Sequence, residues 1–211
     1  MKVVVIAPSE ILEEWKKLPA STDQHTEVFY SENEGIQQLP GQPDAVLYLF
    51  QEYDQDVINW LQQLPVSVCI VNAVIATTAE LGENLVRINA WPGFLGERVE
   101  MAASETVDRG QVESVIAHFG RETEWVTDSC GMISARVVAS IINEAYFAME
   151  DEVSTAAEID IAMKLGTNYP YGPIEWGKKI GLKQIYRLLE KLSTRQKRYT
   201  PSSLLKNAAL A

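Results

Sequence analysis

The feature that most constrains the fold of this chain is a change of pattern part of the way along it. Up to about residue 126, short apolar runs rich in β-branched residues alternate with amphipathic stretches. This alternation is typical of strands and helices that take turns in a parallel sheet. Beyond Gly131 the pattern is helical almost throughout. The sequence therefore predicts an α/β domain over residues 1–126 and an all-helical domain over residues 127–211.

The apolar runs of the first domain predict seven strands, at residues 2–7, 27–30, 45–50, 66–71, 85–88, 99–102 and 123–126. Helices are predicted between them. Ser9 is expected to cap a helix over residues 10–17, and Asp54 a second helix. A later helix is predicted from one apolar face, formed by Val112, Val115, Ile116 and Phe119.

The second domain is predicted to begin with a long helix over residues 133–149. A helix over residues 155–164 follows, with Thr155 and Glu158 as a capping box, and another covers residues 182–192. Gly166 and Gly181 are expected between helices, while Gly172-Pro173 stops the chain and starts the next helix.

Composition narrows the classes of function. The net charge is −11, with −13 up to Thr127 and +2 beyond it. So acidic a first domain repels nucleic acid, which is not expected as a partner. The basic stretch 195–198 is interpreted as a solvated helix end, with a phosphate or membrane site as the alternative.

The apolar runs are too short to span a bilayer and no signal-type segment is present, so no membrane partner and a cytoplasmic location are expected. Two cysteines, Cys69 and Cys130, have no metal-ligand spacing. We expect both thiols to be reduced and no metal site.

Landmarks in a fixed order distinguish the second domain. They are Asp128, Gly131, Arg136, Asn143-Glu144-Ala145, Glu158-Ile159-Asp160, Tyr169-Pro170-Tyr171-Gly172-Pro173, Gly181-Leu182 and Pro201. Together they resemble the C-terminal domain of the 3-hydroxyacyl-CoA dehydrogenase family, although each also has a structural role of its own. The resemblance implies a homodimer through this domain. Candidate interface residues are Val137, Ile141, Ala145 and Ala148 on the long helix, and Leu182, Ile185, Leu188 and Leu189.

The first domain resembles the family's Rossmann-like NAD-binding domain through its opening strand, residues 2–6, and through residues 44–52. The resemblance implies NAD as cofactor. A Rossmann site needs Gly-x-Gly-x-x-Gly after the first strand, whereas residues 7–12 contain no glycine and Pro8 removes an amide donor. The remaining candidates for binding the cofactor are Ala7, Ser9, Glu32 and Glu52.

The family chemistry implies a histidine base held by a glutamate, with a serine and an asparagine that polarise the substrate oxygen. Glu100 matches the glutamate, but neither His25 nor His118 falls near residues 91–94, where the histidine would lie. Asn72 is retained, and Ala135 replaces the family's other asparagine. The short connection over residues 33–44 leaves no room for the helical arm that helps to hold CoA in the family.

Three hypotheses follow. In the first, the protein is a divergent oxidoreductase that acts on a 3-hydroxyacyl-CoA, with Glu100 as base, Asn72 and Ser134 as oxygen ligands, and Tyr48 or Glu52 lining the cleft. In the second, catalysis is lost and the protein is a dimeric binding or scaffolding partner on the same fold. The third is a small-molecule sensor or an isomerase, because fold does not fix function.

Overall fold

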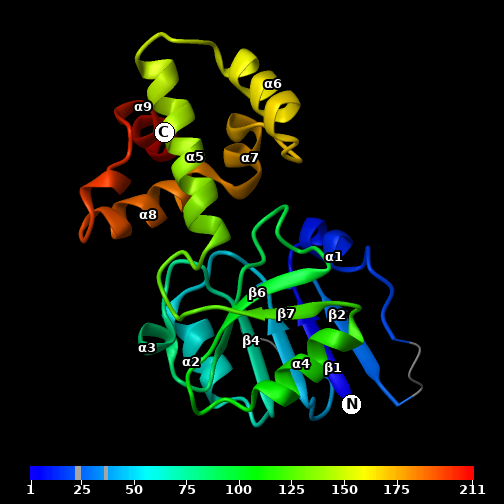
Figure 1. Cartoon of the computed structure of the whole chain (residues 1–211). Coiled ribbons are helices and arrows are strands. Elements are labelled where there is room, and N and C mark those ends of the chain that lie inside the picture. Colours follow the sequence, from blue (N-terminus) through cyan, green and yellow to red (C-terminus); the bar gives the residue numbers. More distant parts are fainter. Residues whose placement is uncertain (22–24, 36–37) are drawn as a thin grey trace. The chain divides into compact units, whose positions relative to one another are not determined.

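The computed structural model describes residues 1–21, 25–35 and 38–211. The chain divides into two compact units, an α/β unit over Met1–Met132 and a helical unit over Ile133–Ala211. Figure 1 labels the elements of both. The predicted fold class, a Rossmann-like domain followed by an all-helical domain, is confirmed.

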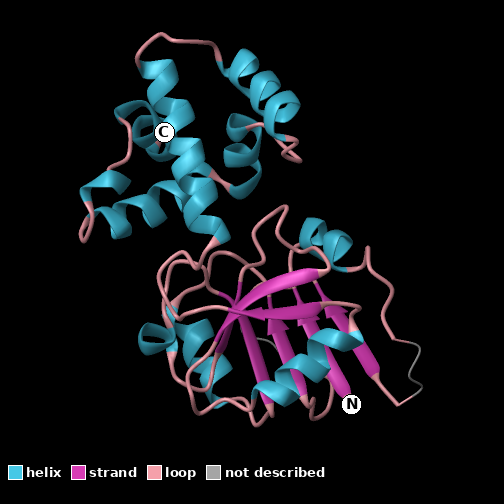
Figure 2. Ribbon diagram, in the orientation of Figure 1, coloured by secondary structure: helices cyan, strands magenta, loops and turns pink. Residues whose placement is uncertain are grey.

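A seven-stranded sheet forms the centre of the α/β unit, in the order β2-β1-β3-β4-β5-β6-β7 (Figure 2). The strands are β1 (Lys2–Ile6), β2 (Glu27–Ser31), β3 (Ala45–Tyr48), β4 (Val68–Asn72), β5 (Val86–Ile88), β6 (Arg98–Ala102) and β7 (Glu122–Trp125). All seven predicted strands are confirmed. The expectation of a purely parallel sheet is wrong at one place, because β6 runs antiparallel to β5.

The helices of this unit cover both faces of the sheet. The apolar sides of α1 (Ser9–Trp15) and α4 (Arg109–His118) pack in one core with Val3, Val5 and other residues of that face. On the opposite face, α2 (Gln55–Gln63) and α3 (Thr78–Leu81) pack against Val4 and Ile6. A strand that is buried on both faces reads as a continuous apolar run, which is why β1, β3 and β4 were evident in the sequence.

Two capping predictions in the α/β unit had different outcomes. Asp54 caps α2 as predicted, since its carboxylate accepts a hydrogen bond from Val57 N at 2.9 Å. Ser9 does not cap α1: Pro8 occupies the N-cap position and the Ser9 hydroxyl bonds to another partner. The single-turn helix α3 escaped prediction because four residues are too few to show a helical period.

The helical unit contains α5 (Ser134–Glu150), α6 (Ala156–Thr167), α7 (Pro173–Ile180), α8 (Leu182–Ser193), the 3-10 turn η1 (Lys197–Tyr199) and α9 (Ser203–Leu210). The predicted capping box at the start of α6 is confirmed, as is Pro173 in the first turn of α7. The prediction that Gly166 lies between helices is wrong, because α6 continues through it to Thr167, and the C-cap Asn168 adopts the left-handed conformation. The sequence reading also missed α9.

The segment between the two units is bonded to the α/β unit. Gly131 N donates to Val74 O at 2.8 Å, and the Asp128 carboxylate accepts hydrogen bonds from Thr78. The predicted boundary at residues 126/127 therefore precedes the division between the compact units, which follows Met132.

Candidate functional site

The turn after β1 is where a Rossmann fold places the pyrophosphate of a dinucleotide, next to the point at which the strand order reverses. In this chain the reversal lies between β1 and β3. The Ala7 amide donates to Ser31 O at 3.0 Å, so it belongs to the contacts between β1 and β2. The Ser9 hydroxyl donates to the Glu32 carboxylate at 2.7 Å. Two of the predicted cofactor-binding residues, Ser9 and Glu32, thus bind each other.

The geometry of this turn does not fit NAD in the usual pose. Pro8, which has no N–H, stands at the helix start, and Glu10 places a carboxylate in the first turn. The helix is only seven residues long, and its positive end already faces two acidic side chains, those of Glu10 and Glu32. A pyrophosphate would meet like charge here in place of the amides of a glycine loop, so we derive no catalytic step through NAD.

The end of β3 carries the other predicted contacts. Tyr48 is fully buried, and its hydroxyl accepts a hydrogen bond from the Gly35 amide at 3.4 Å. Burial raises the pKa of the Tyr48 hydroxyl, which therefore stays protonated. The short connection between β2 and β3 is thus tied to β3. Glu52 lies just past this strand and is exposed.

Glu100 lies on β6, opposite the segment that follows β5. The Asn89 side-chain amide donates to the Glu100 carboxylate at 3.4 Å, and the Asn89 backbone amide donates to Glu100 O at 3.0 Å. Asn89 is fully buried. A neutral amide cannot exchange a proton near pH 7, so Asn89 cannot take the place of the histidine that the family chemistry implies, and Glu100 is the remaining candidate for a base.

Asn72 lies at the carboxyl end of β4 and is 2% exposed. Its side-chain nitrogen donates to Leu49 O at 3.1 Å, and its side-chain oxygen accepts from Ala90 N at 3.1 Å. The amide therefore links the segments that follow β3 and β5 through β4. Both ends of the side chain bond to backbone groups, so this amide has a structural role in the sheet.

Ser134, the second predicted oxygen ligand, is the first residue of α5 and half-buried in the helical unit. Glu100 and Asn72 belong to the α/β unit. The sequence prediction of these residues as catalytic, and of Ala7, Ser9, Glu32 and Glu52 as cofactor ligands, remains a prediction.

Sequence reasoning missed Arg87 on β5, whose side chain makes several hydrogen bonds near the carboxyl ends of the parallel strands. It is fully buried; its guanidinium donates to Ala73 O at 2.8 Å, to Val74 O at 2.9 Å and to the Asp128 carboxylate. A cation in the apolar run of residues 85–88 was the signal that could have found it, since a buried charge needs a partner. Arg87 thereby fastens residues 128–129 to the loop after β4.

Asp128 completes this cluster. Its carboxylate accepts bonds from the Thr78 hydroxyl at 2.6 Å and from the Thr78 amide at 3.0 Å. Partial burial alone would raise the pKa of Asp128, but the bonds from Thr78 and the Arg87 guanidinium outweigh it and leave that pKa below its usual value. The carboxylate is therefore charged at neutral pH.

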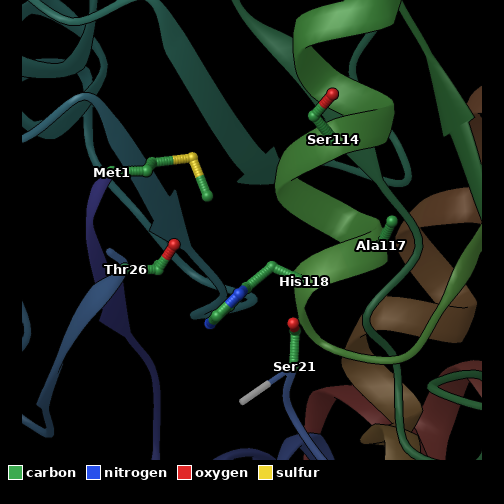
Figure 3. Close-up of a pocket in the computed structure, with 6 residues that line it drawn as sticks. All are labelled: Met1, Ser21, Thr26, Ser114, Ala117 and His118. Atoms are coloured by element: carbon green, nitrogen blue, oxygen red, sulfur yellow. The ribbon is translucent and has the colours of Figure 1, made fainter. Parts of the chain in front are cut away.

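A pocket of about 360 Å³ lies at the opposite edge of the sheet, where β1 and β2 begin (Figure 3). It is lined by Met1, Ser21, Thr26, Ser114, Ala117 and His118. The His118 side chain, 8% exposed, points into it from the last turn of α4. The Ser114 hydroxyl already donates to Gly110 O at 2.9 Å. This pocket contains none of the predicted site residues.

The landmarks of the helical unit have structural roles. The Asp160 carboxylate caps α7, accepting from Ile174 N at 2.7 Å and Glu175 N at 3.1 Å. Asn143 donates to Thr200 O at 2.9 Å and accepts from Ser202 N at 2.9 Å, which holds the segment before α9 on α5. These hydrogen bonds give a structural reason for Asp160 and Asn143, two of the landmarks noted in the sequence.

Among the residues that the structure describes, no three His, Cys, Asp or Glu side chains are grouped to hold a metal ion, and no helix has the length and apolarity to cross a bilayer. Both cysteines are free, and burial raises the pKa of the Cys69 thiol to about 12, so it is unreactive.

Comparison with known protein families gives a match for the helical unit. The model of the 3-hydroxyacyl-CoA dehydrogenase C-terminal domain matches residues 131–211. The 3-hydroxyadipyl-CoA dehydrogenase of Escherichia coli K12 is 46% identical over 93 residues, which are 43% of this chain and 20% of that enzyme. The 3-hydroxybutyryl-CoA dehydrogenase of Clostridioides difficile is 39% identical over 82 residues, 38% of this chain and 29% of that enzyme. The chain thus covers less than a third of either relative.

Solved structures extend the likeness over more of the chain. A crystal structure of 3-hydroxybutyryl-CoA dehydrogenase from Escherichia coli K12 superposes with a TM-score of 0.59 and 35% identity, covering 68% of this chain and 32% of that one. The (S)-3-hydroxybutyryl-CoA dehydrogenase of Ralstonia eutropha has a TM-score of 0.62 at 24% identity, covering 78% and 64%. The second likeness concerns the fold alone. Residues 131–211 therefore carry a C-terminal domain of the 3-hydroxyacyl-CoA dehydrogenase family.

Proposed function

We propose that this protein is a divergent 3-hydroxyacyl-CoA dehydrogenase-like protein in which the NAD-dependent oxidation of 3-hydroxyacyl-CoA is lost or strongly slowed. The observation that carries the proposal is the turn after β1. There Pro8 stands in place of a glycine, and the Ser9 hydroxyl binds the Glu32 carboxylate at 2.7 Å. A hydride cannot be transferred at a useful rate without a bound nicotinamide.

The acid-base groups support the same proposal. Glu100 pairs with the Asn89 amide, and the Asn72 amide is occupied by two backbone groups. Losing a single positioned group typically slows an enzyme by about two to four orders of magnitude. Losing the phosphate turn and the base together removes most of the rate enhancement.

We expect NADH oxidation by the purified protein with acetoacetyl-CoA to run at least ~10⁴-fold below the roughly 10 s⁻¹ that is typical of enzymes. The physical reason is the missing phosphate turn and base. The measurement is the loss of NADH absorbance at high enzyme concentration, paired with calorimetric titration of NADH and of acetoacetyl-CoA.

Clear turnover would contradict this proposal. In that event Glu100→Gln is the first variant to make, because Glu100 is the remaining candidate for the base. A large loss of rate in Glu100→Gln would assign the base, whereas full activity would exclude that assignment. Heat released by acetoacetyl-CoA without turnover would instead favour a binding function, with an acyl-CoA as the ligand.

The alternative function, a dimeric binding or scaffolding protein, is favoured by α6. All twelve residues of this helix are described, and none of them is buried. Ile161 and Leu165 lie four residues apart and are 56% and 84% exposed. Among the interface residues predicted from the sequence, Ile185, Leu188 and Leu189 are fully buried in the unit's own core, so they are unavailable to a partner. We place the dimer contact on α6.

Two free thiols support a reducing, cytoplasmic location.

Replacing Leu165 by serine is expected to weaken the homodimer about 100-fold. Burying a leucine contributes ~1.5 to 3 kcal/mol, and a two-fold interface contains the residue twice. Sedimentation equilibrium of the wild type and the variant gives the two dissociation constants. Leu210→Ser on α9 is the matched control, since Leu210 is also exposed, at 62%. Equal weakening by both substitutions, or none by Leu165→Ser, would exclude α6 as the contact.

A further inference from the structure

The pocket that His118 lines at the amino ends of β1 and β2, which we call the amino-edge pocket, has the size of a small-molecule site (Figure 3). Its volume of about 360 Å³ falls within the range of roughly 300 to 1,000 Å³ that known ligand pockets occupy. The described lining comes from three places in the sequence: Met1 before β1, Ser21 and Thr26 before β2, and the second half of α4. A ligand here would lie at the edge of the sheet opposite the turn after β1.

Backbone contacts hold the walls of the amino-edge pocket in place. The Ser21 amide donates to His118 O at 2.6 Å, which fastens the segment before β2 to the end of α4. Gly120 has a φ of +68°, and a Cβ there would lie 2.8 Å from Pro19 O, so the two segments approach closely. On the other side, the Glu27 amide donates to Met1 O at 2.8 Å. The pocket is therefore preformed, as ligand sites usually are.

His118 is the group in this pocket that lacks a bonding partner. It is 8% exposed, and Figure 3 shows the imidazole directed from α4 into the pocket. The ring lies edge-on to Phe119, with 5.2 Å between ring centroids. Within residues 1–21, 25–35 and 38–211, no group forms a hydrogen bond with either ring nitrogen. A buried polar group without a bond is costly, so a ligand that bonds to the imidazole would be favoured.

The rest of the lining is partly apolar and partly hydroxylated. The Met1 side chain and the Ala117 methyl group supply apolar surface, and Figure 3 shows the Met1 side chain reaching into the pocket. The Ser114 hydroxyl donates to Gly110 O at 2.9 Å, so its oxygen is left to act as an acceptor. This combination suits a molecule with an apolar body and one polar group that both donates and accepts hydrogen bonds.

Charge argues against an ionic ligand. The α/β unit, Met1–Met132, contains 7 Lys or Arg and 21 Asp or Glu, a balance of −14, and its field repels anions. The carboxyl end of α4, where His118 lies, carries a partial negative charge that acts in the same direction. A cation would lose hydration without gaining a counter-ion, because none of the described residues that line the pocket is acidic. A neutral ligand avoids both costs.

We propose that the amino-edge pocket binds a small neutral molecule that joins an apolar body to a carboxamide or lactam group, with the polar group bonded to the His118 imidazole. A carboxamide suits either tautomer of the ring. Its oxygen can accept from the imidazole N–H, and its own N–H can donate to the other ring nitrogen. The side chains of Met1 and Ala117 pack against the apolar body. This proposal goes beyond the function proposed above and does not depend on it.

Histidine NMR tests the proposal directly, because the full-length chain has only two histidines, His25 and His118. His25→Gln leaves the His118 imidazole as the single source of histidine ring signals. Benzamide is the probe, with benzoate and benzylamine as an anion and a cation of similar shape. We expect benzamide to shift the His118 signals saturably, with a dissociation constant of about 1 mM, an ordinary value for so small a ligand. Benzoate and benzylamine should bind at least tenfold more weakly.

A pair of phenylalanine substitutions separates the pocket from the rest of the surface. Ala117 is exposed, so Ala117→Phe fills the pocket from the helix surface and keeps His118 as the reporter. In the His25→Gln background this substitution is expected to abolish the shift caused by benzamide. Gln63→Phe, at an exposed position of α2 outside the lining, is the matched control and should leave the shift unchanged.

The role of the imidazole is tested by saturation-transfer NMR of benzamide with two further variants. His118→Leu removes the polar partner and is expected to weaken binding at least tenfold. His118→Gln retains a side-chain donor and acceptor and should bind within about threefold of the wild type. Circular dichroism establishes that each variant is folded. Should His118→Leu not fold, the comparison of Ala117→Phe with Gln63→Phe still decides.

Three results would overturn the proposal. The first is no saturable shift of the His118 signals by benzamide up to 20 mM. The second is tighter binding of benzoate or benzylamine, which would make this a site for an ion. The third is a benzamide shift that survives Ala117→Phe, because the contact would then lie outside the pocket. None of these results depends on dehydrogenase turnover, so they leave the function proposed above untouched.

Discussion

Replacing Arg87 by methionine is expected to lower the free energy of unfolding of the α/β unit by about 3 kcal/mol. The substitution keeps much of the side-chain volume but removes the donors to Ala73 O, Val74 O and the Asp128 carboxylate. Asp128 would be left partly buried and without its cation, at 23% side-chain exposure. Urea unfolding followed by tryptophan fluorescence measures the change.

The matched control is Arg98→Met. Arg98 forms ion pairs of 3.0 Å with Glu122 and 3.6 Å with Glu124, but its side chain is 69% exposed. Exposed pairs contribute about 0 to 1 kcal/mol, so this variant should remain close to the wild type. Similar losses in the free energy of unfolding for the two variants would contradict the larger effect expected from the burial of Arg87.

The pH dependence of stability offers a second readout of the same cluster. The folded state holds the pKa of Asp128 below its unfolded value, so the carboxylate contributes stability at higher pH. That contribution is lost as the pH falls below about 4, the usual range of a carboxyl group. Between pH 5 and 3 the wild type should therefore lose more stability than Arg87→Met, in which Asp128 lacks its guanidinium partner. Parallel curves would contradict the assignment.

Gly172→Ala is expected to destabilise the helical unit by about 3 kcal/mol. A Cβ built on Gly172 would lie 2.3 Å from Asp160 Oδ1 and 2.4 Å from its Cβ and Cγ. The carboxylate that caps α7 would have to move away from the amides of Ile174 and Glu175. Overpacking costs about 1 to 3 kcal/mol, and each bond to the charged group adds ~1.5 kcal/mol or more.

Chemical unfolding monitored by circular dichroism tests this expectation, because the helical unit supplies much of the helical signal. Gly166→Ala is the control. A Cβ at Gly166 meets nothing within 4 Å, and α6 continues through this position. Alanine there should be neutral or slightly stabilising, since it is the better helix former. A stable Gly172→Ala protein would mean that Asp160 does not hold α7.

The fold was largely predictable, because apolar periodicity is a local property of the sequence. The strand pattern of β1, β3 and β4 and the capping box of Thr155 and Glu158 needed no knowledge of distant residues. The antiparallel β6 was not foreseeable, since strand direction depends on the path of the connection from β5 rather than on residue type. The prediction that Gly166 lies between helices was wrong because an exposed glycine is tolerated within a helix.

The candidate site was less predictable because its bonds join residues far apart in sequence. The Arg87 guanidinium bonds to Asp128, 41 positions away, and the Ser9 hydroxyl to Glu32 across 23. Neither pair has a spacing that a motif could describe. The resemblance identified which residues were missing, and only the structure showed what the remaining ones bind.

Asn72 illustrates a consequence for how active sites are inferred by alignment. A comparison with enzymes of the family would count this asparagine as retained and score it in favour of activity. In this chain the residue holds the ends of three strands in register through Leu49 O and Ala90 N. These two hydrogen bonds give the fold a use for the asparagine that does not depend on catalysis. An asparagine retained at this position is therefore evidence about sheet assembly, and by itself it does not mark catalysis.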